Sequence, residues 1–124
     1  MANLKKIAQF GVFCHNRGLL PINGKNIFDQ LVKEGFLHKK RRNYKGQSVT
    51  FYTVSDAFRN RTFYCEETIE DLRNYDLRNH FFVQVERSFG DGGRRPTVFL
   101  TENGASFLFD LFQDQLRKKR LVRI

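Results

Sequence analysis

Tryptophan is absent from this 124-residue sequence, and cysteine and proline occur only twice each. Two cysteines are too few for the disulfide framework that small secreted domains usually carry, so we expect reduced thiols and a cytoplasmic protein. No apolar run approaches the roughly 20 residues of a membrane-spanning helix, and the first residues lack the apolar stretch of a signal peptide. Because no linker rich in proline or glycine divides the chain, we expect one domain over residues 1–124.

Catalytic motifs are missing as well. None of the three histidines, His15, His38 and His80, belongs to a known nucleophile motif with a serine or cysteine, and the adjacent side chains of Cys14 and His15 splay apart. The glycine-rich segment 90–93 precedes a predicted strand rather than a helix, so it cannot set a phosphate at a helix N-terminus. Acids at 66–71 could suggest a metal-dependent nuclease, but acids in the first turn of a helix already have a structural role. We therefore expect a binding protein and not an enzyme, with no cofactor and no metal.

What the sequence has in excess is positive charge. It carries 22 Lys and Arg residues against 13 Asp and Glu, a formal net charge of +9. Residues 36–46 hold five cations and residues 117–124 hold five more, with no acidic residue in either segment. The remaining basic and acidic residues nearly balance, so the excess lies in these two clusters. Such clustering is typical of proteins that bind polyanions, because each cation that meets a phosphate releases counterions.

Hydrophobic spacing predicts two helices near the N-terminus. The first covers residues 3–16 and ends at Gly18, with an apolar face of Leu4, Ile7, Ala8 and Cys14. The second covers residues 24–34, with Asn23 as its N-cap and Gly35 as its C′ residue. We expect it to bury Ile27, Phe28, Leu31 and Val32. Its outer face is polar, which fits either contact with nucleic acid or an ordinary solvated surface.

A basic hairpin is predicted after these helices. Residues 36–38 and 47–54 have the pattern of strands, and a basic turn from Lys39 to Gly46 joins them. Two helices followed by a hairpin with a cationic tip form the outline of a winged helix-turn-helix. In that arrangement one helix enters the major groove and the hairpin, or wing, contacts the flanking backbone. Four consecutive cations repel one another, so an anionic partner explains them better than an ordinary polar loop does.

The remainder of the chain predicts a second α+β unit. We expect a strand at 61–65, a short helix at 66–76, and a β-hairpin whose strands at 81–86 and 97–100 flank the glycine-rich turn. A long helix capped by Thr101 follows, with a core stripe of Phe107, Leu108, Leu111, Phe112 and Leu116. The expected fold class is thus α+β and winged helix-turn-helix-like, with two N-terminal helices, a β-hairpin wing, a second β-hairpin and a long C-terminal helix.

The C-terminal third carries a family resemblance. Phe89-Gly90-Asp91-Gly92, then Thr101-Glu102-Asn103-Gly104 followed by aromatic and aliphatic residues, resembles the KilAC-type domain of phage antirepressors. Ile7-Ala8-Gln9 and residues 31–35 are similar to the N-terminal part of that domain. The chain departs from the family in having no tryptophan, with Leu100 standing where one is usual. The resemblance implies a phage or prophage protein that regulates transcription.

These observations favour duplex DNA as the partner. Asn26 and Gln30 have the side chains that bond adenine edges, whereas Lys25 and Lys33 suit phosphates. The candidate DNA-contacting residues are Lys25, Asn26, Gln30 and Lys33 on the second helix, Lys39, Lys40, Arg41, Arg42 and Lys45 on the wing, Arg94 and Arg95 after the glycine-rich turn, and Arg117, Lys118, Lys119 and Arg120 in the tail. The alternative is an inhibitor that captures a repressor or another protein. In that case the basic clusters of this chain would meet an acidic surface on the captured protein. A homodimer stays open.

Overall fold

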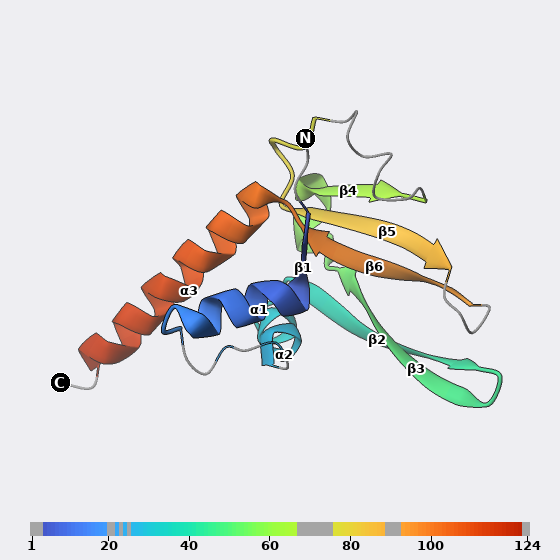
Figure 1. Ribbon diagram of the computed structural model, residues 1–124, viewed down its shortest axis with the longest axis horizontal. Helices are drawn as coiled ribbons and strands as arrows, with labels where there is room; N and C mark the ends of the chain where they lie inside the picture. The colour runs from blue at the N-terminus through green and yellow to red at the C-terminus, as the bar shows by residue number, and fades with distance from the viewer. Residues whose placement is uncertain are drawn as a thin grey trace.

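The computed structural model describes residues 4–19, 22, 24, 26–66, 76–88 and 93–122, with the backbone alone over 116–122. The elements in chain order are β1 (Lys5–Lys6), α1 (Ile7–Asn16), α2 (Asn26–Lys33), β2 (Leu37–Tyr44), β3 (Gln47–Val54), the 3-10 helix η1 (Asp56–Arg61), β4 (Thr62–Cys65), β5 (Phe82–Ser88), β6 (Arg94–Leu100) and α3 (Glu102–Val122). The expected α+β architecture is confirmed: two N-terminal helices precede a β-hairpin, and a second hairpin leads into a long C-terminal helix (Figure 1).

The described strands form two separate sheets. Four of them make a sheet in the order β1-β6-β5-β4, in which β4 runs parallel to β5 and the other pairs are antiparallel. β2 and β3 form a two-stranded hairpin that projects from the body of the molecule (Figure 1). The Val54 N–H donates to Gln84 Oε1 of β5 at 2.9 Å, which ties the base of this hairpin to the larger sheet.

Both faces of the four-stranded sheet are covered. The main core lies between one face, the three helices and the base of the hairpin, and its largest fully buried side chains include Phe10, Phe82, Ile27, Leu31, Leu100 and Leu108. The opposite face carries a smaller cluster of Leu77, Val83, Val85 and Phe99. Successive strand residues point to opposite faces, so Phe82 enters the main core while Val83 enters the smaller cluster. A sheet buried on both faces is a rigid base for the hairpin.

The first helix begins four residues later than expected. Lys5 and Lys6 are extended and pair with Leu100 and Phe99 as strand β1, so α1 starts at Ile7. Ala8 is exposed, and its expected place on the buried face is taken by Phe10 and Gly11. The cause is the open edge of β6, because pairing with a distant strand overrides the local preference of residues 3–6 for helix.

The second helix ends as predicted. Gly35 has a φ of +83°, and its N–H donates to the Val32 carbonyl at 3.1 Å. The Phe36 N–H donates to the Leu31 carbonyl at 2.9 Å, which completes a Schellman motif. Both Ile27 and Leu31 are buried as expected, and Phe28 and Val32 pack partly against the core. The predicted N-cap, Asn23, lies outside the described residues.

The prediction of a basic turn over Lys39 to Gly46 is wrong. β2 continues through Tyr44, and only Lys45 and Gly46 form the turn. Both turn residues have positive φ, as in the type I′ turn that matches the twist of a hairpin. The run of cations tolerates an extended strand because neighbours alternate between faces, so like charges on one face stand about 7 Å apart. The wing is therefore charged along its length and not only at its tip.

The C-terminal predictions agree with the structure where residues are described. β4, β5, β6 and α3 all form, whereas most of the expected helix at 66–76 and the turn at 89–92 lie outside the described residues. On α3, Leu108 and Phe112 are buried and Leu111 packs partly against the core. The prediction that Phe107 belongs to the core stripe is wrong, because this residue is 36% exposed and its ring stacks on Phe81 at 4.6 Å between centroids. The side chain of Leu116 lies outside the described residues.

The start of α3 is fixed by a backbone contact that only glycine permits. The Gly104 N–H donates to Thr101 Oγ1 at 3.0 Å, which confirms the predicted cap. The Thr101 N–H donates to the Phe81 carbonyl at 3.1 Å, so the first turn of the helix lies directly against that peptide group. A Cβ on Gly104 would stand 1.9 Å from the same carbonyl oxygen. In the Thr-x-x-Gly pattern, Thr101 thus caps the helix, and Gly104 lets the helix backbone lie close to the Phe81 carbonyl.

We predict that Gly104→Ala destabilises the protein, although alanine in a helix is normally favoured over glycine by about 1 kcal/mol. The clash with the backbone of Phe81 should outweigh that preference and leave a net loss of about 2 kcal/mol in the free energy of unfolding. Urea denaturation followed by circular dichroism measures it. Ser106→Ala, at an exposed position of the same helix, is the control and should change the free energy by less than about 0.5 kcal/mol. A stabilised Gly104→Ala protein would contradict the close approach.

Candidate nucleic-acid interface

The β2–β3 hairpin carries the densest positive charge of the chain. In the register of the hairpin, Lys39, Lys40, Arg41 and Arg42 lie opposite Tyr52, Phe51, Thr50 and Val49. All four basic side chains are exposed, as is Lys45 in the turn. Within the described part of the chain, no carboxylate pairs with Lys39, Lys40 or Arg41. Arg78 behaves differently: it contacts Asp76 at 2.8 Å, and this hydrogen-bonded pair lowers the pKa of the Asp76 carboxyl to about 2.

The two faces of the hairpin differ, and one of them lies against the body. Lys40, Arg42 and Tyr44 share this inner face with Val49 and Phe51 of β3. The Arg42 guanidinium donates to the Arg94 carbonyl at 3.3 Å and stands 5.2 Å from the centroid of the Phe51 ring. Phe51 is buried, and Tyr44 and Val49 are half-buried. The inner face is therefore apolar at its centre and is held to the start of β6.

The opposite, outer face is polar towards the tip. Lys39, Arg41 and Asn43 of β2 share it with Ser48 and Thr50 of β3, and all five side chains are exposed. Nearer the base, Tyr52 on the same face stacks on Phe28 of α2 at 4.6 Å between centroids. The outer face thus begins beside α2 and runs out along the hairpin as a cationic and amide-bearing surface.

A second group of arginines lies on β5 and β6. Arg94 and Arg95, which the sequence indicates as candidates, begin β6. Arg87 of β5 lies directly opposite Arg95 in the sheet, and its guanidinium stands 5.9 Å from the Phe99 ring. Arg87 is not among the residues predicted from the sequence, although counting back across the glycine-rich turn pairs it with Arg95. The contact between Arg42 and Arg94 joins this group to the hairpin.

The candidates on α2 are less available than the sequence suggests. Gln30 is half-buried, and its amide donates to Glu34 Oε1 at 3.1 Å. The Gln115 amide of α3 donates to the other oxygen of the same carboxylate at 3.2 Å. Asn26 and Lys33 are exposed, whereas Lys25 lies outside the described residues. Gln30 therefore takes part in the junction between α2 and α3.

An acidic side chain also lies on α2. Asp29 is exposed, and burial together with the charge of Asp29 raises the pKa of the Tyr52 hydroxyl. Asp29 follows Phe28, whose ring stacks on Tyr52, so the carboxylate lies on the part of α2 that is next to the base of the hairpin. A negative charge there opposes the approach of phosphates to α2 and leaves the distal half of the hairpin more favourable.

The structure does not bring the two basic clusters together. Arg117, Lys118, Lys119 and Arg120 fall in the last turns of α3, whose backbone is helical to Val122. Figure 1 shows this end of α3 and the tip of the β2–β3 hairpin at opposite ends of the molecule. Both point to the same side, with α1 and α2 between them. A partner that contacts both clusters must therefore be elongated.

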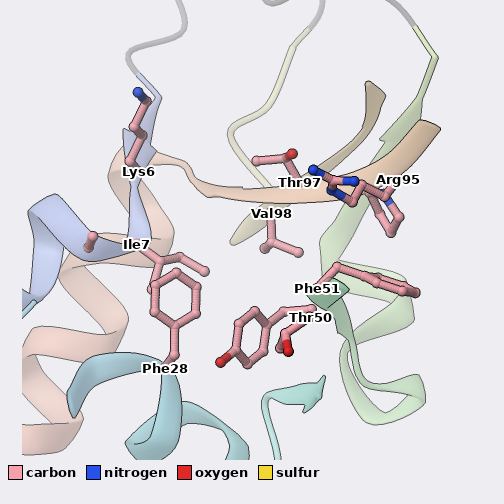
Figure 2. A pocket seen from close by; sticks show the side chains of 11 residues that line it. Lys6, Ile7, Phe28, Thr50, Phe51, Arg95, Thr97 and Val98 are labelled. Atoms are coloured by element: carbon pink, nitrogen blue, oxygen red, sulfur yellow. The ribbon is translucent and has the colours of Figure 1, made fainter. Parts of the chain in front are cut away.

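A pocket of about 260 Å³ lies between the hairpin and the body (Figure 2). Ile7, Phe28 and Val98 surround it with apolar side chains, whereas Lys6 at its rim points away. Its described lining contains no histidine, cysteine or carboxylate. The pocket thus offers a largely apolar hollow at the base of the hairpin, with Thr50, Tyr52 and Thr97 among the residues that line it.

Neither cysteine belongs to a metal site in the described structure. No three His, Cys, Asp or Glu side chains gather there in a group that could hold a metal ion. Cys14 is fully buried in the main core and Cys65 is half-buried on β4, and neither forms a disulfide. Burial raises the pKa of the Cys14 thiol to about 11, although Arg17 opposes part of that effect.

We predict that the two thiols react at very different rates. With a pKa of about 11, Cys14 is a thiolate in roughly one molecule in a thousand at pH 8, and the core blocks reagents. In the folded protein, iodoacetamide at pH 8 should label Cys65 first and Cys14 only after addition of denaturant, as peptide mass spectrometry can show. Cys14→Ala is the control and should leave the labelling of Cys65 unchanged. Equal labelling rates for both thiols in the folded state would contradict the burial of Cys14.

None of the described helices is both long and apolar enough to cross a membrane. Compared with protein-family models, with curated proteins and with solved structures, the chain matches none. The resemblance to KilAC-type domains therefore stays a prediction from the sequence.

Proposed function

We propose that the chain is a regulatory protein that binds duplex DNA through its β2–β3 hairpin. One observation carries the proposal: five cations, Lys39, Lys40, Arg41, Arg42 and Lys45, lie exposed on a projecting ribbon whose sequence from 37 to 54 contains no acid. Phosphates of a duplex are the regular polyanion that such a ribbon suits. The resemblance of the C-terminal third to phage antirepressors supports a role in transcription regulation of a phage or prophage.

The dimensions of the hairpin support this partner. Eight residues per strand, at about 3.3 Å each, span about 26 Å, which is most of one helical turn of DNA. Arg94 lies beside the inner face, where its carbonyl accepts a hydrogen bond from Arg42, and Arg95 and Arg87 add positive charge on β6 and β5. The C-terminal cations from Arg117 to Arg120 would meet the same duplex only at a distance from the hairpin, because α3 carries them to the other end of the molecule. Lys33 and Asn26 on α2 lie between these two regions.

The first test is the salt dependence of binding. If phosphate contacts dominate, the logarithm of the affinity for a random-sequence duplex should fall linearly with the logarithm of salt concentration. The slope should be about −0.9 for each phosphate that is neutralised. Fluorescence anisotropy with a labelled duplex, between low and physiological salt, measures it. The absence of binding at low salt would overturn the proposal. It would favour the alternative, in which the basic residues capture a repressor or another protein that has an acidic surface.

The second test compares two variants of equal net charge. In the hairpin variant, Lys39, Lys40, Arg41 and Arg42 are all changed to Gln. We expect weaker binding to every duplex and a salt slope smaller by up to about 3.6, since up to four phosphate contacts are lost. The matched control changes four exposed cations elsewhere, Lys5, Lys6, Arg59 and Arg61, to Gln.

The control variant loses the same charge but none of the hairpin cations, so most of the affinity and the slope should remain. Circular dichroism must show that both variants fold, as expected for exposed positions that each change stability by about 0.5 kcal/mol. Equal weakening by the two variants would mean that net charge alone attracts DNA and would remove the hairpin from the interface.

A further inference from the structure

We infer that the β2–β3 hairpin reads DNA sequence through its outer face, with Arg41 and Asn43 contacting base edges in the major groove. This inference rests on the proposed function. It assigns to the ribbon the reading role that the sequence pattern predicts for α2.

Access of α2 to a groove is limited. The helix has eight residues and is therefore about 12 Å long. Ile27 and Leu31 face the core, and Phe28 is covered by Tyr52. Gln30, which could otherwise bond adenine, is engaged with Glu34. The exposed carboxylate of Asp29 is negative, so it would repel the phosphates on either side of a groove.

The hairpin, in contrast, has the shape that the groove accepts. The major groove of B-DNA is about 12 Å wide and admits a two-stranded β-ribbon. The β2–β3 hairpin projects from the body and has a turn of only two residues. Nothing broader than the ribbon itself therefore stands at its leading end. Lys45 in that turn is placed to meet a phosphate at the edge of the groove.

The two faces determine which side chains meet the bases. The inner face is occupied by the body, since Arg42 bonds the Arg94 carbonyl and Phe51 is buried. Among the residues that the structure describes, none makes a comparable contact with Arg41, Asn43 or Ser48 on the outer face, and all three are exposed. Only the outer face can turn towards base edges without removing Phe51 from its packing.

The spacing of the outer-face side chains and their hydrogen-bonding groups indicate which base each would contact. Side chains on one face of a strand repeat about every 6.7 Å, close to two base pairs at about 3.4 Å each. Arg41 and Asn43 would therefore contact base pairs two steps apart. Arginine bonds the O6 and N7 atoms of guanine, and asparagine bonds the N6 and N7 atoms of adenine. Ser48, opposite Asn43 in the register, can support either contact. We expect a preferred site with a guanine and an adenine at that separation.

Selection from random duplexes, followed by two matched pairs of variants, tests this inference. Asn43→Ala on the outer face is compared with Gln47→Ala on the inner face, both exposed amides near the tip. Asn43→Ala should reduce the affinity for the selected site at least about fivefold and abolish the preference at one base pair. Gln47→Ala should keep the preference. Neither variant changes the charge, so the salt slope should stay as in the parent.

The second pair changes one arginine on each face. Arg41→Gln should remove the preference for guanine at one position, while Arg42→Gln should weaken all duplexes alike. The inference is overturned if the parent selects no sequence, if Asn43→Ala and Arg41→Gln keep the parental preference, or if Asn26→Ala removes it instead. In each of those cases the salt dependence and the four-cation variant still report separately on whether the protein binds duplex DNA at all.

Discussion

The packing of Phe36 holds together the parts of the molecule that matter for the interface. Its N–H ends α2 by bonding the Leu31 carbonyl, and its own carbonyl accepts the Ser55 N–H at 2.9 Å. Its ring is 4% exposed and contacts three other aromatic rings, Phe58, Phe82 and Phe107. These rings belong to η1, β5 and α3. Through its backbone and its ring, this one residue therefore joins the end of a helix, both ends of the hairpin, the sheet and the C-terminal helix.

This junction explains how a projecting ribbon keeps a defined direction. An isolated two-stranded hairpin is at best marginally stable in water. Here its base is closed by Leu37 and Val54 in the main core and by the bonds from Val54 to Gln84 and from Ser55 Oγ to the Gly35 carbonyl. The base belongs to the core and the distal half is left to solvent. Cations placed on that half need no desolvation by the fold, and their charge remains available to a partner.

The sequence pattern predicted correctly those helix ends and strands that depend on interactions between neighbouring residues. Gly35 and Thr101 mark helix ends because the groups they satisfy lie within a few residues, and both predictions are confirmed. The alternation in Gln47–Val54 likewise located β3. The strand character of Lys39 to Tyr44 could not be found in this way, because four consecutive cations carry no apolar alternation. It arises from cross-strand pairing and from a two-residue turn.

The sequence also could not show which side chains share a surface. The bond from Gln30 to Glu34 is a local i,i+4 contact, but the bond from Gln115 to the same carboxylate depends on α3 approaching α2 from a distant part of the chain. The separation of the two basic clusters follows from the length and direction of α3. The position of Arg87 opposite Arg95 could have been predicted from the sequence, because the register of the second hairpin follows once its turn is located. Composition and clustering favour a polyanionic partner, and tertiary packing determines which of the basic residues are exposed.

The turn of the basic hairpin has one further consequence. Lys45 has a φ of +50°, a left-handed conformation that costs an ordinary side chain about 1 kcal/mol and that asparagine or glycine adopts more easily. The outermost residue of the ribbon thus combines an unfavourable backbone conformation with a positive charge. A phosphate bound by Lys45 in this conformation would stabilise the turn together with the complex. Ordering of the tip and occupancy of the interface are then linked equilibria, and each increases the population of the other.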